Sequence, residues 1–402
     1  MHSTSLTPVT PPRLPVLSWR YFLDRRKSSL PSVLDSGRVL PTTSGRAAIA
    51  LALRLAGCRA GDRVLVPTYH CPTMVAPIVA LGATPVFYPI SATGEAAPEN
   101  LPAGVADGCR AIIAPHYFGI PRRMSRIRAY CDESGIALIE DCAHAFFGVA
   151  EGRSVGSWGD YAIASLTKFF PVSEGGCLVT RSPKLASLRL GSRPVGAELR
   201  AVADALELGV AHGRLAGINV LLAAAFRAKR AVRSSAANGA APAAEHSGDA
   251  MQRAVTRACS DFSEGALPFR RIARAVWALV GVGGQGRIVA RRQDNYRWLA
   301  RRLAHLSNAH PLGPDCPDGA APYVFPLWVR DPEAVYQKIR ASGVPVFRWD
   351  DRWPDTPELS NDSGGEWARH VFQIGCHQDL EAPELEWIAR TLEQLIDGDR
   401  TA

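Results

Sequence analysis

The chain has 402 residues, of which 47% are apolar, so it can bury a core of two or three domains. Its net charge is +8, but the arginines are scattered and no nucleic-acid-binding motif accompanies them. We therefore expect no nucleic-acid partner, and acidic small substrates explain the charge equally well. The nine cysteines form no CxxC pair and several lie in apolar segments, which indicates a reducing cytoplasm.

Residues 1–35 are predicted to be an N-terminal extension. Prolines at positions 8, 11, 12 and 15 precede a basic patch at 25–27, which predicts a segment that is partly disordered or draped over the body. Residues 1–15 lack the apolar stretch of a signal peptide, so no secretion is expected.

Helical and extended segments alternate between residues 44 and 180. The expected helices are 45–55, 74–81 and 124–133. The expected strands are 63–67, 84–88, 111–115, 137–140, 161–165 and 177–180. Short apolar strands separated by helices predict an α/β fold with a mostly parallel sheet covered on both faces. Ligands of such sheets bind at the carboxyl ends of the strands.

The pattern is weaker beyond residue 183. We expect helical structure over 201–225 and an Ala/Ser/Gly-rich linker over 234–249. The apolar run 215–226 ends in a basic stretch over 227–233, but twelve residues cannot span a bilayer as a helix. We interpret it as a buried or dimer-interface helix, and an interfacial membrane helix is the alternative.

The C-terminal part predicts a smaller α/β unit. Its expected elements are a helix at 291–303, a strand at 323–329, a helix at 332–342, a strand at 344–347 and a helix at 383–395. The predicted organisation is therefore an extension (1–35), a large cofactor-binding domain (36–285, with an atypical segment at 190–260) and a small domain (286–402).

Lys168 is the residue that indicates a catalytic function most directly. It is one of only five lysines, apolar residues flank it, and Glu174-Gly175-Gly176 follows shortly after. A desolvated lysine suits pyridoxal phosphate (PLP), which needs an amine for a Schiff base, a carboxylate beside its pyridine nitrogen and donors for its phosphate. Asp141, at the tip of strand 137–140, is the candidate carboxylate. A helix N-cap is the competing interpretation of Asp141.

Further candidates surround this pair in the sequence. His144 would lie one turn from Asp141 if the segment is helical. Ser165 or Thr167 could reach the phosphate. The remaining phosphate candidates open the helix at 45–55, whose N–H groups can bind an anion: Ser44, Gly45 and Arg46.

Tyr69, His70 and Cys71 follow the strand that ends at Pro67, and one of them could face the pyridine ring. Sequence order does not say which one. The charged and aromatic segments 347–352 and 375–379 of the small domain could close over the crevice, but no residue of theirs is singled out as a site.

The joint order of these motifs resembles the DegT/StrS family of PLP-dependent sugar aminotransferases, of the fold-type I (aspartate aminotransferase-like) class. The similar segments are 43–48, 61–67, 82–87, 115–119, 139–145 and 165–176. The resemblance implies that Lys168 attaches PLP and shuttles the proton, that Asp141 pairs with the pyridine nitrogen and that His144 lies near the ring hydroxyl. It also implies a phosphate site made by Ser165 with Gly45 and Arg46.

The same resemblance implies a reaction. Family members move an amino group from an amino acid, commonly L-glutamate, to a keto-sugar attached to a nucleotide, in polysaccharide or glycosylated-metabolite synthesis. Relatives that dehydrate their substrate have histidine at the lysine position, so Lys168 favours aminotransfer. We expect a cytoplasmic homodimer with no metal ion.

The chain departs from the family pattern in three places. Cys71 stands where relatives often stack an aromatic ring on the cofactor, Ser165 is closer to Lys168 than in many members, and no Asn-Tyr-Arg-like segment is recognisable over 190–260. Two alternatives therefore stay open: a PLP enzyme of the same family acting on a non-sugar carbonyl substrate, and a catalytically silent binding or regulatory relative.

Overall fold

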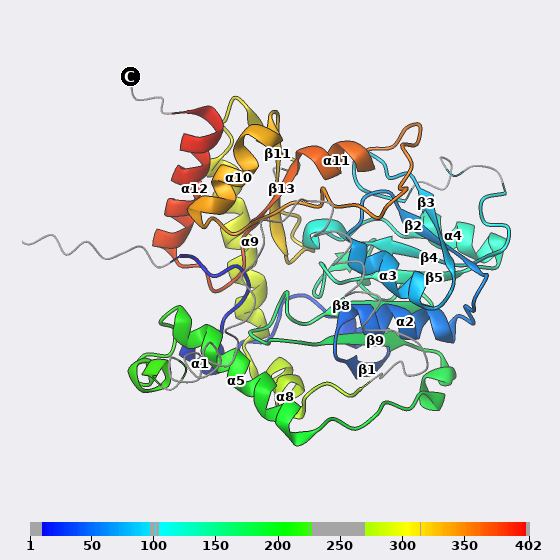
Figure 1. Cartoon of the computed structure of the whole chain (residues 1–402), viewed down its shortest axis with the longest axis horizontal. Coiled ribbons are helices and arrows are strands. Elements are labelled where there is room, and N and C mark those ends of the chain that lie inside the picture. The colour runs from blue at the N-terminus through cyan, green and yellow to red at the C-terminus, as the bar shows by residue number, and fades with distance from the viewer. Residues whose placement is uncertain are drawn as a thin grey trace, which may run out of the picture.

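Two β-sheets of different size organise the protein (Figure 1). The computed structural model describes residues 10–96, 101, 104–224, 226, 270–313 and 315–398. The predicted linker 234–249, the basic stretch 227–233 and the first nine residues of the extension lie outside the described residues.

The large sheet has seven strands in the order β1-β9-β8-β5-β4-β2-β3. Their bounds are β1 (Arg38–Thr42), β2 (Arg63–Pro67), β3 (Thr84–Tyr88), β4 (Cys109–Pro115), β5 (Ala137–Asp141), β8 (Tyr161–Ser165) and β9 (Gly176–Thr180). The pairs β2–β3, β2–β4, β4–β5 and β5–β8 are parallel, and β9 runs antiparallel to both of its neighbours. The predicted mostly parallel sheet is confirmed.

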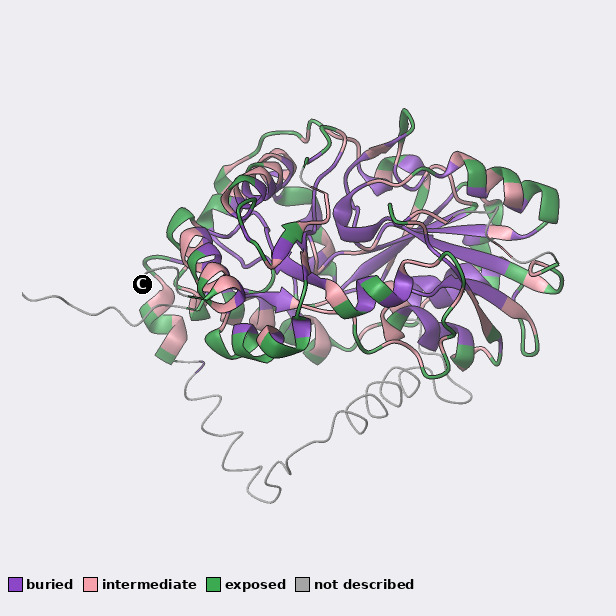
Figure 2. Ribbon diagram, turned by 90° about the horizontal axis from the view of Figure 1, so that it is seen from above, coloured by how far each residue is buried: buried purple, intermediate pink, exposed green. Residues whose placement is uncertain are grey.

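Helices cover both faces of this sheet because its strands alternate apolar side chains to either side. Ile113 and Ile139 pack in one core with α2 (Gly45–Leu55) and α3 (Pro72–Ala80). Ile112 and Leu138 point the other way, into a core shared with α4 (Ser125–Ser134) and α8 (Arg274–Val282). Figure 2 shows the sheet as a buried layer inside the larger part of the molecule.

The small sheet is antiparallel, with the order β10-β11-β13-β12. Its strands are β10 (Ala309–Pro311), β11 (Val324–Val329), β12 (Val346–Phe347) and β13 (Val371–Gly375). A separate core joins this sheet to its helices α9 (Gln285–Arg302), α10 (Pro332–Ser342) and α12 (Ala382–Asp397). A further helix, α11 (Gly364–His370), leads directly into β13.

The remaining elements are short or lie at the margin. They are α1 (Trp19–Leu23), α5 (Val195–Ala211), the two-stranded β6–β7 sheet (Val149–Ala150 and Arg153–Ser154) and the 3-10 turns η1 (Val33–Ser36), η3 (Tyr117–Gly119) and η4 (Pro183–Ser187). In the apolar run 215–226, Leu215 is buried but Val220 and Leu221 are exposed, so of the two interpretations, a buried or a dimer-interface helix, the second stays a prediction for that part. None of the described helices has the length and apolar content needed to cross a membrane.

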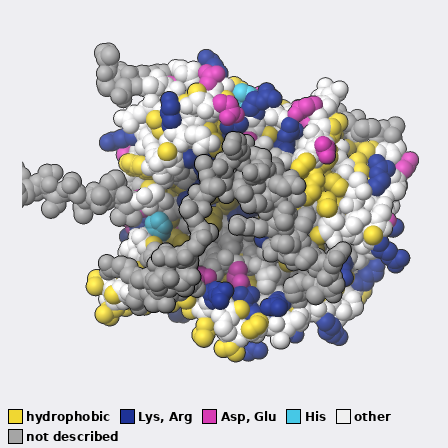
Figure 3. Space-filling model, viewed as in Figure 1, with side chains coloured by type: hydrophobic (Ala, Val, Ile, Leu, Met, Phe, Trp, Pro, Cys, Tyr) yellow, Lys and Arg dark blue, Asp and Glu magenta, His cyan; other side chains and the backbone are white. Residues whose placement is uncertain are grey.

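The described part of the N-terminal extension packs against both parts of the molecule. The Tyr21 hydroxyl donates to the Leu279 carbonyl on α8 (2.5 Å), and the Val16 N–H donates to the Asp379 carboxylate after β13 (3.3 Å). Val16, Leu17 and Tyr21 are buried. On the face that Figure 3 shows, the Lys and Arg side chains are spread out and do not gather in one patch.

Candidate functional site

A cavity of about 290 Å³ opens where β4, β5 and β8 end. This volume is at the small end of ligand pockets, which hold roughly 300–1,000 Å³. Eight of the nine residues predicted from the sequence line it: Ser44, Gly45, Arg46, Cys71, Asp141, His144, Ser165 and Lys168. The ninth, Tyr69, is not among the lining residues. The structure thus gathers residues that are up to 124 positions apart in the chain.

Lys168 lies in a tight turn directly after β8. The N–H groups of Phe169 and Phe170 donate to the Leu166 carbonyl (3.1 and 2.9 Å), which closes the turn and directs Lys168 into the cavity. Its amine Nζ lies 5.1 Å from the ring centre of Tyr323. Desolvation lowers the pKa of the Lys168 amine, and the nearby Cys71 and Asp141 only partly oppose this. Loss of the proton, which makes the amine nucleophilic, is therefore easier than for a lysine in water.

Asp141 is the last residue of β5 and is 6% exposed. Its Oδ1 accepts a hydrogen bond from the Ala143 N–H (2.8 Å), and the residues that follow form bends, not a helix. The helix N-cap interpretation is therefore wrong, because a turn mediated by the Asp side chain replaces the helix. Burial raises the pKa of Asp141, against the hydrogen bond from Ala143 and the charge of Lys168. A cation placed in the cavity would stabilise the carboxylate.

His144 lines the same cavity as Asp141, but the predicted helical turn between them does not form. Its Nδ1 accepts from the Phe118 N–H (3.3 Å), so the neutral ring carries its proton on Nε2. Burial and the charge of Lys168 keep the pKa of His144 well below its ordinary value. The ring packs between Tyr323 and Trp349, at 4.5 and 5.0 Å between centroids. His144 is thus a fixed, neutral hydrogen-bond donor.

The opposite end of the cavity is formed by the first turn of α2. Ser44 is its N-cap, and the Ser44 hydroxyl accepts from the Ala47 N–H (3.2 Å). N–H groups in a first helical turn lack acceptors within the helix and attract anions. The Ser165 hydroxyl, 3.3 Å from that of Thr167, faces the same cavity. This end suits a phosphate group.

The structure distinguishes between the three neighbours Tyr69, His70 and Cys71. Cys71 lines the cavity, and its Sγ lies 2.8 Å from the Thr73 hydroxyl. Tyr69 is buried among aromatic rings and its hydroxyl accepts from Gln373 (3.1 Å). His70 stacks on Phe87 at 5.2 Å, and its Nε2 accepts from the Trp353 N–H (2.9 Å). Of the three, Cys71 is the one positioned to face a ligand.

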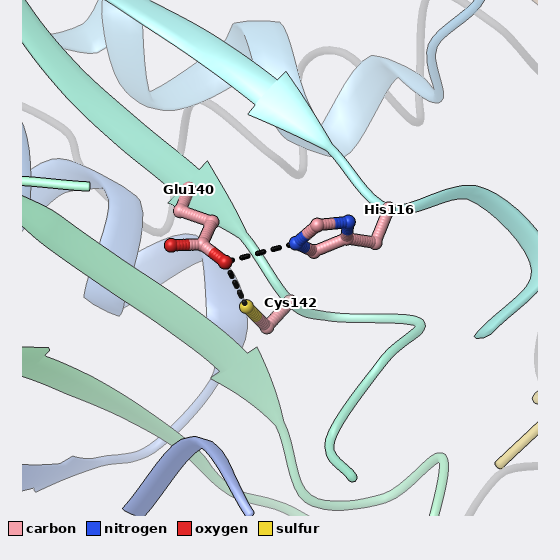
Figure 4. Close-up of side chains that lie close together, drawn as sticks. All are labelled: His116, Glu140 and Cys142. Atoms are coloured by element: carbon pink, nitrogen blue, oxygen red, sulfur yellow. Dashed lines mark hydrogen bonds and ion pairs between the residues drawn. The ribbon is translucent and has the colours of Figure 1, made fainter. Parts of the chain in front are cut away.

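Glu140, the neighbour of Asp141, forms a buried cluster with His116 and Cys142 (Figure 4). One oxygen accepts from His116 Nε2 (2.9 Å) and the Gly156 N–H (2.6 Å), and lies 3.8 Å from the Cys142 thiol. The other accepts from the N–H groups of Trp158 (2.9 Å) and Gly159 (3.0 Å). These donors use the lone pairs that a metal ion would need. The cluster is therefore a hydrogen-bond network that fixes the ends of β4 and β5.

A second cavity, of about 690 Å³, adjoins the first and reaches the small sheet. The two share Cys71, Thr73, His144, Lys168 and Trp349. Its other lining residues include Arg13 from the extension, Arg340 from α10, and Arg348. Lys168 thus stands between a small cavity in the large sheet and a larger cavity rich in arginine.

Tyr323, Trp349 and His116 were not predicted as site residues. Trp349 lies in the charged and aromatic segment 347–352, for which no site was predicted. Tyr323 directly precedes β11, and no motif around it indicates a site. Both reach Lys168 or His144 only through the packing of the small sheet against the large one.

Comparison with known proteins shows what the chain is similar to. Residues 28–213, which are less than half of the chain, match the model of the DegT/DnrJ/EryC1/StrS aminotransferase family. Protein MosB of Rhizobium meliloti is 37% identical over 157 residues, which are 38% of this chain and 31% of MosB. GDP-perosamine synthase of Vibrio cholerae is 32% identical over 164 residues, covering 40% of this chain and 45% of the synthase. The chain thus matches less than half the length of these curated relatives.

A solved structure extends the likeness of fold to almost the whole chain. Helicobacter pylori PseC, an aminotransferase involved in the biosynthesis of pseudoaminic acid, superposes with a TM-score of 0.62. The superposition covers 91% of this chain and 88% of PseC, at 14% identity. The expected α/β fold is therefore confirmed for the small part of the molecule as well as the large one.

Proposed function

We propose that the protein is a PLP-dependent aminotransferase that moves an amino group from an amino acid, with L-glutamate as the expected donor, to a keto-sugar. The acceptor is expected to be linked to a nucleotide and to serve polysaccharide or glycosylated-metabolite synthesis. The observation that carries this proposal is the placement of Lys168 and Asp141 in one cavity with the first turn of α2, inside a segment that matches an aminotransferase family.

PLP fits the residues of the smaller cavity. Lys168 and Asp141 are two groups whose charged forms burial disfavours. A ligand with an aldehyde for the amine and a basic ring nitrogen for the carboxylate would give each of them a partner. Gly45, Arg46 and Ser165 would hold its phosphate, and the His144 Nε2–H would donate to the ring oxygen. Cys71 would face the ring.

Bound PLP supplies an electron sink for the substrate carbon that carries the amino group. Lys168 is the candidate to take a proton from that carbon and return it, because it lines the cavity and burial lowers the pKa of its amine. Asp141 would hold a proton on the ring nitrogen through its charge. Tyr323 lies beside the amine, and Trp349 lines the same two cavities as Lys168 and packs on His144, so both rings would limit the space for a bound ligand.

The larger cavity supports acidic substrates. Arg13 packs its guanidinium 4.8 Å above the Phe347 ring. Arg348 pairs with Glu333 and Asp350, yet its buried Nη1 has no hydrogen-bond partner in the described structure. With Arg340 these cations suit the carboxylates of an amino-acid donor and the phosphates of a nucleotide-linked acceptor. The name of the relative GDP-perosamine synthase also favours such an acceptor.

The test is an absorbance spectrum of the protein saturated with PLP, recorded before and after addition of L-glutamate. We expect a near-visible band that L-glutamate removes and that Lys168→Ala lacks. Lys184→Ala is the matched control, because Lys184 is an exposed lysine on the surface turn η4. It should keep both the band and the response.

The other outcomes separate the alternatives. If wild type and Lys168→Ala both lack the band, the cofactor assignment fails and a binding or regulatory relative becomes the better account. A band that L-glutamate leaves unchanged keeps PLP but overturns the choice of donor. Transfer to uncharged keto compounds, in preference to nucleotide-linked ones, would favour a non-sugar substrate.

We also infer that the protein works as a cytoplasmic homodimer whose large domain spans 36–285 and small domain 286–402. Exposed apolar side chains on α5, among them Val195 (74% exposed) and Leu199 (67%), support a contact with a second copy. Sedimentation of the purified protein at micromolar concentration tests the oligomeric state, and a monomer would contradict it.

A further inference from the structure

Arg292, on α9, is a buried cation whose hydrogen-bond acceptors are all uncharged. The side chain is 0% exposed. Nε donates to Gln378 Oε1 (2.9 Å), Nη1 to the carbonyls of Pro322 (2.8 Å) and Tyr323 (3.3 Å), and Nη2 to the carbonyl of Lys168 (2.6 Å). Burial lowers the pKa of Arg292 to about 10. The charge of Asp379 only partly opposes this effect. Burying a cation that bonds to no charged group is costly, so the contacts call for an explanation.

The acceptors of Arg292 form two walls around the Lys168 amine. One wall is the turn 166–170, which Arg292 holds through the Lys168 carbonyl while its guanidinium lies 4.4 Å above the Phe169 ring. The other is the Pro322–Tyr323 main chain, whose Tyr323 ring is 5.1 Å from the Lys168 Nζ. A single planar guanidinium thus bonds to both walls at once.

Gln378, which follows β13, makes a second hydrogen-bonded contact with the same turn. Its Oε1 accepts from Arg292, and its Nε2 donates to the Phe169 carbonyl (2.8 Å). Gln378 is 0% exposed, so water does not replace either bond. Both residues come from the small part of the molecule, whereas the lysine turn ends a strand of the large sheet.

We propose that Arg292, supported by Gln378, is a positioning residue that fixes the Lys168 amine relative to Tyr323 and the cofactor cavity. The small domain thereby sets the place of the reactive lysine. Arg292 touches no reacting atom and acts through the lysine main chain. The inference rests on the proposed function only for its consequence in catalysis, since the contacts themselves exist without a cofactor.

The first experiment needs no cofactor. Amide hydrogen exchange of the protein without PLP is followed by mass spectrometry on peptides that cover 166–170, in wild type, Arg292→Gln and Arg291→Gln. Arg291 is a matched control, because it lies on the same helix and donates to the Leu380 carbonyl (3.2 Å), outside the lysine turn. Arg292→Gln should speed exchange in the turn about tenfold or more, because it loses hydrogen bonds from a charged donor. Arg291→Gln should leave the turn unchanged.

A second variant keeps the proposal testable if Arg292→Gln does not fold. Gln378→Met removes both bonds of Gln378 with little change in volume, and it should speed exchange in the same turn. Unchanged exchange at 166–170 in either folded variant, or an equal rise over the whole chain, would overturn the proposal.

A kinetic measurement then tests the consequence for catalysis. In the L-glutamate half-reaction, Arg292→Gln should lower the maximal rate about tenfold or more and leave the KM for L-glutamate within about threefold of wild type. A raised KM with an unchanged maximal rate would contradict a positioning role. Loss of the wild-type half-reaction itself would refute the proposed function, whereas the exchange result would still decide whether Arg292 holds the turn.

Discussion

Glu140 and Asp141 are consecutive carboxylates whose pKa values shift in opposite directions. Burial raises the pKa of Glu140, but bonds from His116, Gly156 and Gly159 outweigh it and the net shift is downward. Asp141 has one main-chain donor, so burial prevails and its pKa is raised. Neighbours in a strand face opposite sides of the sheet, which separates the two roles. Glu140 is held by the fold, and Asp141 is left for a ligand.

The lowered pKa of Glu140 predicts a pH dependence of stability. An ionised Glu140 stabilises the fold fully above its ordinary value of 4.5, and this contribution is lost as the pH falls below that value. Glu140→Gln should lower the free energy of unfolding at pH 7 by about 3 kcal/mol, because buried donors lose a charged acceptor. The difference from wild type should shrink between pH 4.5 and 3.

Urea unfolding at several pH values measures this effect. Glu133→Gln, at an exposed position on α4, is the control and should match wild type throughout. A deficit for Glu140→Gln that stays constant from pH 7 to pH 3 would show that the charge of Glu140 is not what stabilises the fold.

At the scale of elements, a close contact with β9 positions the first turn of α2. A Cβ on Gly176 would lie 2.4 Å from the Ser44 carbonyl carbon and 2.5 Å from the Gly45 nitrogen. Main-chain atoms cannot yield as a flexible side chain can. The second glycine of Glu174-Gly175-Gly176 therefore lets the sheet bring the phosphate end of the cavity next to Ser165, which pairs with Gly176 across β8 and β9.

Gly176→Ala should therefore destabilise the protein by about 2 kcal/mol and weaken PLP binding, because it pushes the helix N-terminus away from β9. Gly281→Ala, on α8 and outside the cavity lining, is the matched control, since its new Cβ would meet no atom within 4 Å. PLP titration and thermal unfolding of both variants measure the difference. Equal effects of the two substitutions would argue against this contact.

Many helices and strands could be predicted from the sequence, because the periodic spacing of their apolar residues is contained within each segment. The bounds of α2, β2, β3, β8 and α10 agree with the predictions. Strand β1 was missed because Pro41 interrupts its pattern, which an edge strand tolerates. Helix α11 and strand β13 were missed because the chain passes from one directly to the other without a turn signal.

Some residues of the candidate site could likewise be predicted from the sequence, and others could not. Ser44, Asp141 and Lys168 each follow or precede a predictable strand or helix, so their convergence follows from the parallel order of the sheet. Tyr323 and Arg292 contact the Lys168 turn from more than 120 residues away, and only the packing of the two sheets brings them there. The assumed helix after Asp141 was wrong because a side-chain turn ends the strand.

At the scale of the whole molecule, the N-terminal segment joins the two parts that enclose Lys168. The Tyr21 hydroxyl bonds to α8, the Pro12 carbonyl lies 2.9 Å from His377 Nε2, and Arg13 lines the larger cavity. The glycines between α8 and α9 leave room for this segment, since a Cβ on Gly283 would overlap the Tyr21 ring. The segment is thus part of the folded body.

Tyr21→Ala should lower the free energy of unfolding by about 3 kcal/mol, because it empties a buried aromatic site and removes a hydrogen bond. Leu23→Ala, two residues later at a position that is 79% exposed, should change it by less than about 0.5 kcal/mol. Denaturant unfolding of both variants compares them. A Tyr21→Ala protein as stable as wild type would mean that the segment is dispensable for the fold.

The most direct test of the central claim is to locate the lysine that binds PLP. The protein is incubated with PLP, reduced with borohydride, digested and analysed by mass spectrometry. The chain has five lysines, and Lys27, Lys184 and Lys338 are exposed, whereas Lys168 lines both cavities. We predict the cofactor on the peptide that contains Lys168. Labelling of another lysine in its place, or of none, would contradict the account.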